Sequence, residues 1–347
     1  DRRLDRGKHL DQFKLTGNLT LCSIDGTQYY SSQSIRCKGC LTKNKDNPDK
    51  STTYQHAALQ AALTHPDLKQ VIPVLAENIN NTDGAKKQDC ELNAAKRLIP
   101  ALRELYPKKS LIITGDDLFS KQVLIDLIHE HRFNYIFVAK PGSHKYMMKW
   151  LSANLELPER KERDKKGNLI RYQWQNKVPL HGGKDAVEVN YFCKKTYKVD
   201  RDGNETLIRT ESWVTELTVT ANNVILLVRG AKARWKIENE CFNNLKNQGY
   251  NLEHNYGHGE NHLSFNFYLL TMLAFTFHQV FELTDPTFTA CRKKAGSKIN
   301  LWGQLRALIN LFIFQSWQKL IGFFLDKYRY FNPITNSYDF NSLGQSP

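Results

Sequence analysis

Three features of this 347-residue sequence predict an α/β fold. Short apolar runs that suit buried strands recur up to residue 142, and two of them lead directly into acidic residues. Segments between these runs carry apolar residues at the spacing of amphipathic helices. From residue 143 to 222 the pattern alternates between polar and apolar residues, as in half-buried strands. We therefore expect a mixed sheet with flanking helices and a β-rich insertion.

The first predicted strand covers residues 19–24 and runs straight into Asp25, which places an acid at its end. Residues 54–63 and 71–76 are joined by a turn-like segment, so they predict a hairpin. Pro73 has no backbone N–H to donate to a neighbouring strand. The second strand of the hairpin is therefore expected at a sheet edge.

A helix capped by Asp89 and stopped by Pro107 is predicted next. The short apolar run 111–114 then predicts a buried strand that delivers Asp116 and Asp117. Because open α/β sheets bind ligands where their strands end, Asp25 and Asp116 both lie where a ligand is expected.

A second helix is predicted from Ser120, followed by a buried strand over residues 135–139. Apolar periodicity gives this helix four inward positions: Val123, Leu124, Leu127 and Ile128.

The chain carries 49 Lys and Arg against 35 Asp and Glu, a formal charge of +14. This excess favours an acidic partner such as a nucleic acid backbone or an anionic membrane surface. The most apolar stretch, residues 265–281, is interrupted by polar residues and is shorter than the ~20 residues that span a bilayer, which predicts a core helix. No secretory signal opens the sequence, and the seven cysteines are scattered, so reduced thiols in a cytoplasm are expected.

Two groups of potential metal ligands stand out. Cys37 and Cys40 have ligand spacing, but the nearest histidines, His56 and His65, complete no standard pattern, so a turn with two reduced thiols is preferred. The histidines at every fourth position from 254 to 262 would align on a helix, but Gly257 disfavours a helix there. We therefore prefer a loop that binds no zinc and whose histidines form hydrogen bonds or contact DNA. These histidines are His254, His258 and His262.

Residues 231–245 predict a helix whose apolar face includes a carboxylate. At about 100° per residue, with Trp235 at 0°, Glu238 falls at about −60° and Arg234 at about −100°, within the apolar arc. Glu240, at about +140°, faces away. A carboxylate facing a core needs a cation or hydrogen bonds. Either an Arg234–Glu238 pair at the core rim or a metal site shared with Asp25 and Asp116 satisfies this need.

The order of these acids resembles the bacterial DDE transposases of insertion sequences, particularly the family named after insertion sequence four. The resemblance covers residues 19–282 and includes the sequences GDDLFSKQ and RWKIENECFNNLK. The spacing of Arg234 and Glu238 fits the signature around the family's third acid. Ala231 stands at the family's Tyr position, and Lys246 lies one residue beyond its Lys position.

The resemblance implies a ribonuclease H-like mixed sheet with a β-rich insertion before the helix of the catalytic Glu. It implies a catalytic core of residues 1–142 and 223–285, the insertion at 143–222, and a C-terminal helical segment and tail at 286–347. A homodimer on DNA, near the nucleoid of a bacterial cytoplasm and away from membranes, is the expected assembly.

The implied activity is metal-dependent cleavage of transposon ends and strand transfer into target DNA. Asp25, Asp116 and Glu238 are the implied catalytic residues and ligands of two Mg²⁺ ions, for which Mn²⁺ can substitute.

Arg234 and Lys246 would bind phosphates. Trp213 would stack on a flipped base, with a buried strand Trp as the alternative. Two other functions remain open: a domesticated or decayed transposase that binds DNA without cutting it, and a ribonuclease H-like nuclease without strand transfer.

Overall fold

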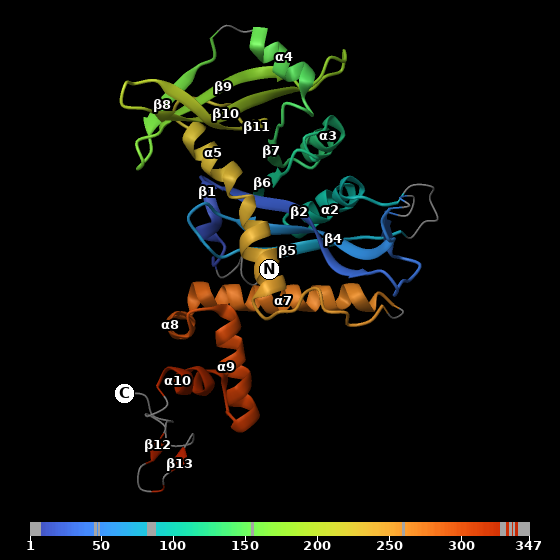
Figure 1. Cartoon of the computed structure of the whole chain (residues 1–347), viewed down its shortest axis with the longest axis vertical. Helices are drawn as coiled ribbons and strands as arrows, with labels where there is room; N and C mark the ends of the chain where they lie inside the picture. The colour runs from blue at the N-terminus through green and yellow to red at the C-terminus, as the bar shows by residue number, and fades with distance from the viewer. Residues whose placement is uncertain are drawn as a thin grey trace. The chain divides into compact units, whose positions relative to one another are not determined.

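The computed structural model describes residues 8–44, 47, 49–81, 88–153, 156–258, 261–326, 331–332, 335 and 337–338 (Figure 1). The chain divides into two compact units, Asp1–Glu238 and Asn239–Pro347. Each unit has a hydrophobic core cluster of its own.

A mixed sheet of 11 strands forms the first unit. Its centre consists of β2 (Leu19–Ser32), β4 (Thr53–Thr64), β5 (Ile72–Ile79), β6 (Ser110–Gly115) and β7 (Asn134–Val138). The strands β2, β4 and β5 pair antiparallel, whereas β6 and β7 follow parallel to β2. Two short strands, β1 (Lys14–Thr16) and β3 (Leu41–Lys43), pair with β2 and β4, and a 3-10 helix, η1 (Asp11–Phe13), precedes them. This order confirms the predicted ribonuclease H-like α/β fold.

Asp25 lies inside β2 rather than at its end, because β2 is longer than predicted. The parallel pairing of β2 with β6 stops at Ser23 and Thr114, whereas β2 continues beside β4 up to Ser32. Asp25 therefore still lies just beyond the end of the parallel pairing. The hairpin of β4 and β5 is confirmed, and β5, with Pro73, pairs with β4 alone among the described strands.

Two helices connect the central strands. α2 (Glu91–Leu105) packs against β4 and β5, and α3 (Gln122–Glu130) packs against β7 (Figure 1). The predicted cap at Asp89 is wrong by one residue: Cys90 is the N-cap, and the Asp89 carboxylate accepts a hydrogen bond from the Cys90 N–H. Val123, predicted to face inward, is 62% exposed because the buried face of α3 is centred on Leu124, Ile125 and Ile128.

The predicted insertion begins with α4 (Lys145–Ala153) and continues with four strands, β8 (Glu159–Arg163), β9 (Leu169–Pro179), β10 (Glu188–Val199) and β11 (Glu205–Thr215). β11 pairs antiparallel with β7, so these strands extend the central sheet. α5 (Val224–Lys232) then packs on one face of the sheet, over buried residues of β2, β6 and β11. Of the charged run after Glu159, residues 159–163 form the mostly exposed strand β8.

The chain leaves the first unit in a π-helix, η2 (Ile237–Phe242). The helices that follow are α6 (Asn243–Asn247), α7 (Leu263–Thr284), α8 (Pro286–Ala295), α9 (Lys298–Leu311) and α10 (Trp317–Leu325). Two paired strands of two residues each, β12 (Phe331–Asn332) and β13 (Ser337–Tyr338), end the described chain. The predicted core helix is α7, but Leu270, Leu273 and Phe277 on it are more than half exposed. None of the described helices is long and apolar enough to cross a membrane.

Candidate active site

The alternation of strand residues puts Asp25 and Asp116 on the same face of the sheet. Leu21 of β2 and Ile112 of β6 both belong to the core cluster under α5. Side chains an even number of residues along a strand share a face, so Asp25 and, directly after β6, Asp116 continue these two rows. Both carboxylates therefore lie on the face of the sheet on which α5 packs.

Glu238 and Arg234 follow α5. Arg234 Nη1 lies 2.7 Å from Glu238 Oε1 and 3.7 Å from Asp25 Oδ2, which brings Asp25 and Glu238 to one cation. The predicted Arg234–Glu238 pair is thus present, with the Arg234 side chain 8% exposed and that of Glu238 42% exposed. Lys236 Nζ, which binds the Pro66 and Leu68 carbonyl oxygens, fixes this segment to the loop between β4 and β5.

The helix that carries Glu238 is less regular than predicted. α5 ends at Lys232, and a π-helix begins at Ile237, so angles of 100° per residue do not hold across the segment. As a result, Trp235 is 52% exposed instead of facing the core, and the buried side chains are those of Arg234 and Ile237. Glu238 is also less buried than the helical angles predicted.

Asp25 carries the strongest electrostatic perturbation of the site. Its pKa is raised to about 7, mainly by burial; the positive charge of Arg234 lowers it, and the negative charges of Glu238, Glu91 and Asp116 add to the rise. Repulsion of this kind shows that the carboxylates lie close enough to influence one another.

Glu91, which the sequence analysis missed, is a fourth acid at this place. It is the first residue of α2, and its carboxylate lies against the backbone of Gly26, where any Cβ would collide with it. Its pKa is raised by burial and by the charge of Asp116. An acid in the first turn of a helix is common, so the sequence offered no distinguishing signal.

Asp117, next to Asp116, is bound to the loop after β7. Its carboxylate accepts hydrogen bonds from the Lys140 backbone N–H at 2.7 Å and from the Ser143 hydroxyl, and it lies 3.6 Å from His144 Nε2. Asp117 therefore fixes the loop after β7. The Asp116 carboxylate accepts the Leu118 N–H at 2.9 Å and remains half-exposed.

Comparison with known families shows the family of the chain. Residues 42–276, more than half of the chain, match the family described as transposase DDE domain. The chain belongs to this family. The matched region of this DDE transposase includes Asp116 and Glu238 but begins after Asp25. The assignment of Asp25 to the same group therefore depends on its place in the central strand β2. The chain matches no curated protein.

The sequence predicts two further DNA contacts of this transposase, Trp213 and Lys246. Trp213 is 5% exposed and stacks on Phe192 with 5.5 Å between ring centroids, because β11 turns it into the core cluster under α5. The structure thus gives Trp213 the alternative role of a buried strand residue instead of a base-stacking one. Lys246, in the second unit, pairs with Glu253 at 2.8 Å.

The histidine-rich segment is a loop, as predicted. Residues 254–258 have no helical structure, and His262 adopts a left-handed conformation as the residue before α7. A helical alignment of His254, His258 and His262 is therefore absent from the described part of this segment.

The acids of this transposase fit a divalent metal in their chemistry. Carboxylate oxygens are the ligands that Mg²⁺ and Mn²⁺ prefer. The charges of Glu91, Asp116 and Glu238 act on Asp25, that of Asp116 also acts on Glu91, and the Arg234 guanidinium lies beside Asp25 and Glu238. Within the described residues their oxygens are not gathered into a single set less than 4.8 Å apart, and Arg234 holds Glu238.

Proposed function

We propose that this transposase cuts the ends of a mobile DNA element and joins them to target DNA. The observation that supports this proposal best is the perturbed Asp25 on the central strand, to which Glu238 and Asp116 both contribute charge repulsion. Carboxylates that repel one another and have a perturbed pKa are a property of metal-dependent phosphoryl-transfer sites. A homodimer bound to DNA in a bacterial cytoplasm is the assembly we propose.

In this proposal Asp25, Asp116 and Glu238 would hold two Mg²⁺ ions, which would supply Lewis acidity for attack on a phosphodiester. Asp25, on whose pKa the charges of the other acids act, would be one of the ligands. Arg234, almost fully buried, neutralises Asp25 and Glu238 and orients Glu238 through a 2.7 Å hydrogen bond. Lys246, which belongs to the second unit, would bind a DNA phosphate.

The test is incubation of the purified chain with DNA that contains the element's ends, with Mg²⁺ and with Mn²⁺. Cleavage at the ends, followed by covalent joining to a second DNA, supports the proposal. Cleavage without joining would indicate a nuclease, and binding without cleavage would indicate a decayed transposase.

Glu238→Gln is expected to eliminate cleavage while leaving the chain folded. A Gln keeps the size and a hydrogen-bond acceptor for Arg234 but loses the charge that a metal requires. Because the Glu238 side chain is 42% exposed, we expect the free energy of unfolding to fall by only about 1 kcal/mol, from the weaker Arg234 contact. The measurements are end cleavage and thermal melting.

Glu240→Gln is the matched control, two residues further along the same π-helix. It should retain cleavage within a few-fold of the unaltered chain. An active Glu238→Gln protein combined with an inactive Glu240→Gln protein would transfer the third-ligand role to Glu240.

DNA binding is expected to weaken steeply with salt. A chain of charge +14 displaces counterions from several phosphates, and four contacts correspond to a loss of roughly 10²-fold in affinity between 50 and 200 mM salt. Fluorescence anisotropy across this range measures the slope, and Lys246→Gln should reduce it by about one phosphate contact. A flat salt dependence would point to a partner other than DNA.

A further inference from the structure

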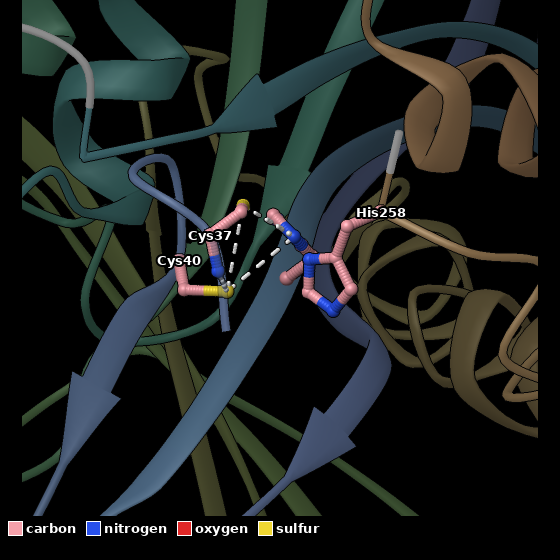
Figure 2. A group of neighbouring side chains, drawn as sticks. Cys37, Cys40 and His258 are labelled. Atoms are coloured by element: carbon pink, nitrogen blue, oxygen red, sulfur yellow. Dashed lines mark hydrogen bonds between the residues drawn. The ribbon is translucent and has the colours of Figure 1, made fainter. Parts of the chain in front are cut away.

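A second group of chemically reactive side chains lies away from the acids. Cys37 and Cys40 occupy the loop between β2 and β3, and His56 lies on β4, opposite Tyr30 in the pairing with β2. Figure 2 shows the sulfur atoms of both cysteines directed to the same small space. On β4, His56 is four residues from Gln60, the partner of Asp25, a separation of about 13 Å along the strand.

The distances within this group match those of a zinc site. Cys37 Sγ and Cys40 Sγ are 3.7 Å apart, and His56 Nε2 lies 3.5 Å from the first and 3.6 Å from the second. Tetrahedral zinc, with bonds of about 2.3 Å to sulfur and about 2.0–2.1 Å to nitrogen, separates two sulfurs by about 3.8 Å and a sulfur from a nitrogen by about 3.6 Å. A disulfide would instead bring the sulfurs to about 2.0 Å.

The surroundings hold these three atoms in place. The Cys40 N–H donates to the Cys37 carbonyl oxygen at 3.2 Å, and the Cys37 N–H lies 3.3 Å from Cys40 Sγ, which closes the loop into a turn. The ring of His56 stacks on Tyr29, with 5.9 Å between the ring centroids. Cys40 and His56 are 4% and 6% exposed, so a bound ion would be shielded from water on this side.

We propose that Cys37, Cys40 and His56 bind one Zn²⁺ ion that fastens the loop after β2 to β4. Two thiolates and a neutral imidazole suit zinc by their softness, and two thiolates cancel its charge, as a buried position requires. The ion would have a structural role, separate from the acids. The inference does not depend on the proposed transposition activity, because zinc binding is measured without DNA.

The test starts with the full chain expressed in zinc-supplemented medium and purified under reducing conditions. Elemental analysis should find about one zinc per chain, and Co²⁺ exchanged into the site should give the visible and thiolate charge-transfer absorption of tetrahedral sulfur ligation. Removal of zinc with a chelator should lower the Tm by at least about 5 °C.

Cys37→Ser, Cys40→Ser and His56→Gln should each reduce the zinc content at least tenfold and abolish the Tm response to the chelator. Cys90→Ser and His65→Gln are the matched controls, since Cys90 is an exposed cysteine and His65 a half-buried histidine outside the group. Both should retain zinc. To find a fourth donor, His254, His258 and His262 are replaced in turn.

Three results would overturn the proposal. They are the absence of stoichiometric zinc in the unaltered chain, cobalt spectra without thiolate absorption, and a Cys37–Cys40 disulfide found by thiol counting in place of the metal. The first two are measured on the unaltered chain, so they remain decisive even if a cysteine variant fails to fold.

Discussion

Asp25→Asn is expected to reduce end cleavage by about 10³-fold or more while leaving DNA affinity equal or higher. An amide is a poor ligand for Mg²⁺, and loss of one position for the metal removes several kcal/mol of transition-state stabilisation. Affinity is retained because the substitution removes a negative charge that repels phosphate. Cleavage rates and anisotropy on the same DNA separate the two effects, and retained cleavage would exclude Asp25 from the site.

The same variant should be more stable than the unaltered chain above neutral pH when metal is absent. The pKa of Asp25 is about 7 in the folded chain and 3.8 ordinarily. Between these values the folded chain holds a proton that the unfolded chain has lost, so stability falls as the pH rises through this window and stays low above it. Asn carries no charge, so at pH 8 we expect Asp25→Asn to be more stable by roughly 1–3 kcal/mol.

Urea unfolding of both proteins with a chelator at pH 4 and pH 8 measures this difference. The difference should be much smaller at pH 4, where the carboxyl is protonated in the folded chain and, close to its ordinary pKa of 3.8, still partly protonated in the unfolded chain. A pH-independent difference would mean that burial of the Asp25 charge does not limit stability.

The adjacent acids Asp116 and Asp117 should give opposite phenotypes. Asp116→Asn is expected to abolish cleavage with little change in stability, because its half-exposed carboxylate accepts a single recorded hydrogen bond, from Leu118. Asp117→Asn weakens the hydrogen bonds to Lys140 and Ser143 at a buried position, so it should cost about 1–3 kcal/mol of stability. At a temperature where it remains folded, its cleavage should persist.

Cleavage assays at low temperature together with thermal melts distinguish the two variants. If Asp117→Asn is folded but inactive and Asp116→Asn is active, the second catalytic acid is Asp117 and not Asp116.

The central strands could be predicted because each buries a short apolar run bounded by turn residues or acids. The runs 111–114 and 135–139 correspond to β6 and β7 within one residue at each end. The segment after α5 could not be predicted as well, because a π-helix changes the angle between successive residues without a signal in residue type. This irregularity explains why Trp235 is exposed although periodicity placed it inward.

The candidate site was predictable only as far as single strands and helices revealed it. Asp116 was marked by the strand that precedes it, and the Arg234–Glu238 pair by its spacing of four residues. Glu91 and His56 are brought to their partners by tertiary structure. The Glu91 side chain, at the start of α2, lies against Gly26, and β4 carries His56 alongside β2. His56 follows Cys40 by a spacing that no local zinc motif uses, so only the register of β2 and β4 brings it to the cysteines.

The pairing of β7 with β11 has a consequence for synthesis of the chain. β6 covers one edge of β7 as soon as both strands exist, but the other edge waits for β11, about 70 residues later. At the usual rates of translation, this edge stays open on the ribosome for roughly 4–14 s. An uncovered strand edge can pair with other nascent chains, so this interval is the period of greatest aggregation risk. Because Glu238 emerges later still, an unfinished chain lacks the third acid, and cleavage by it is not expected before the sheet is complete.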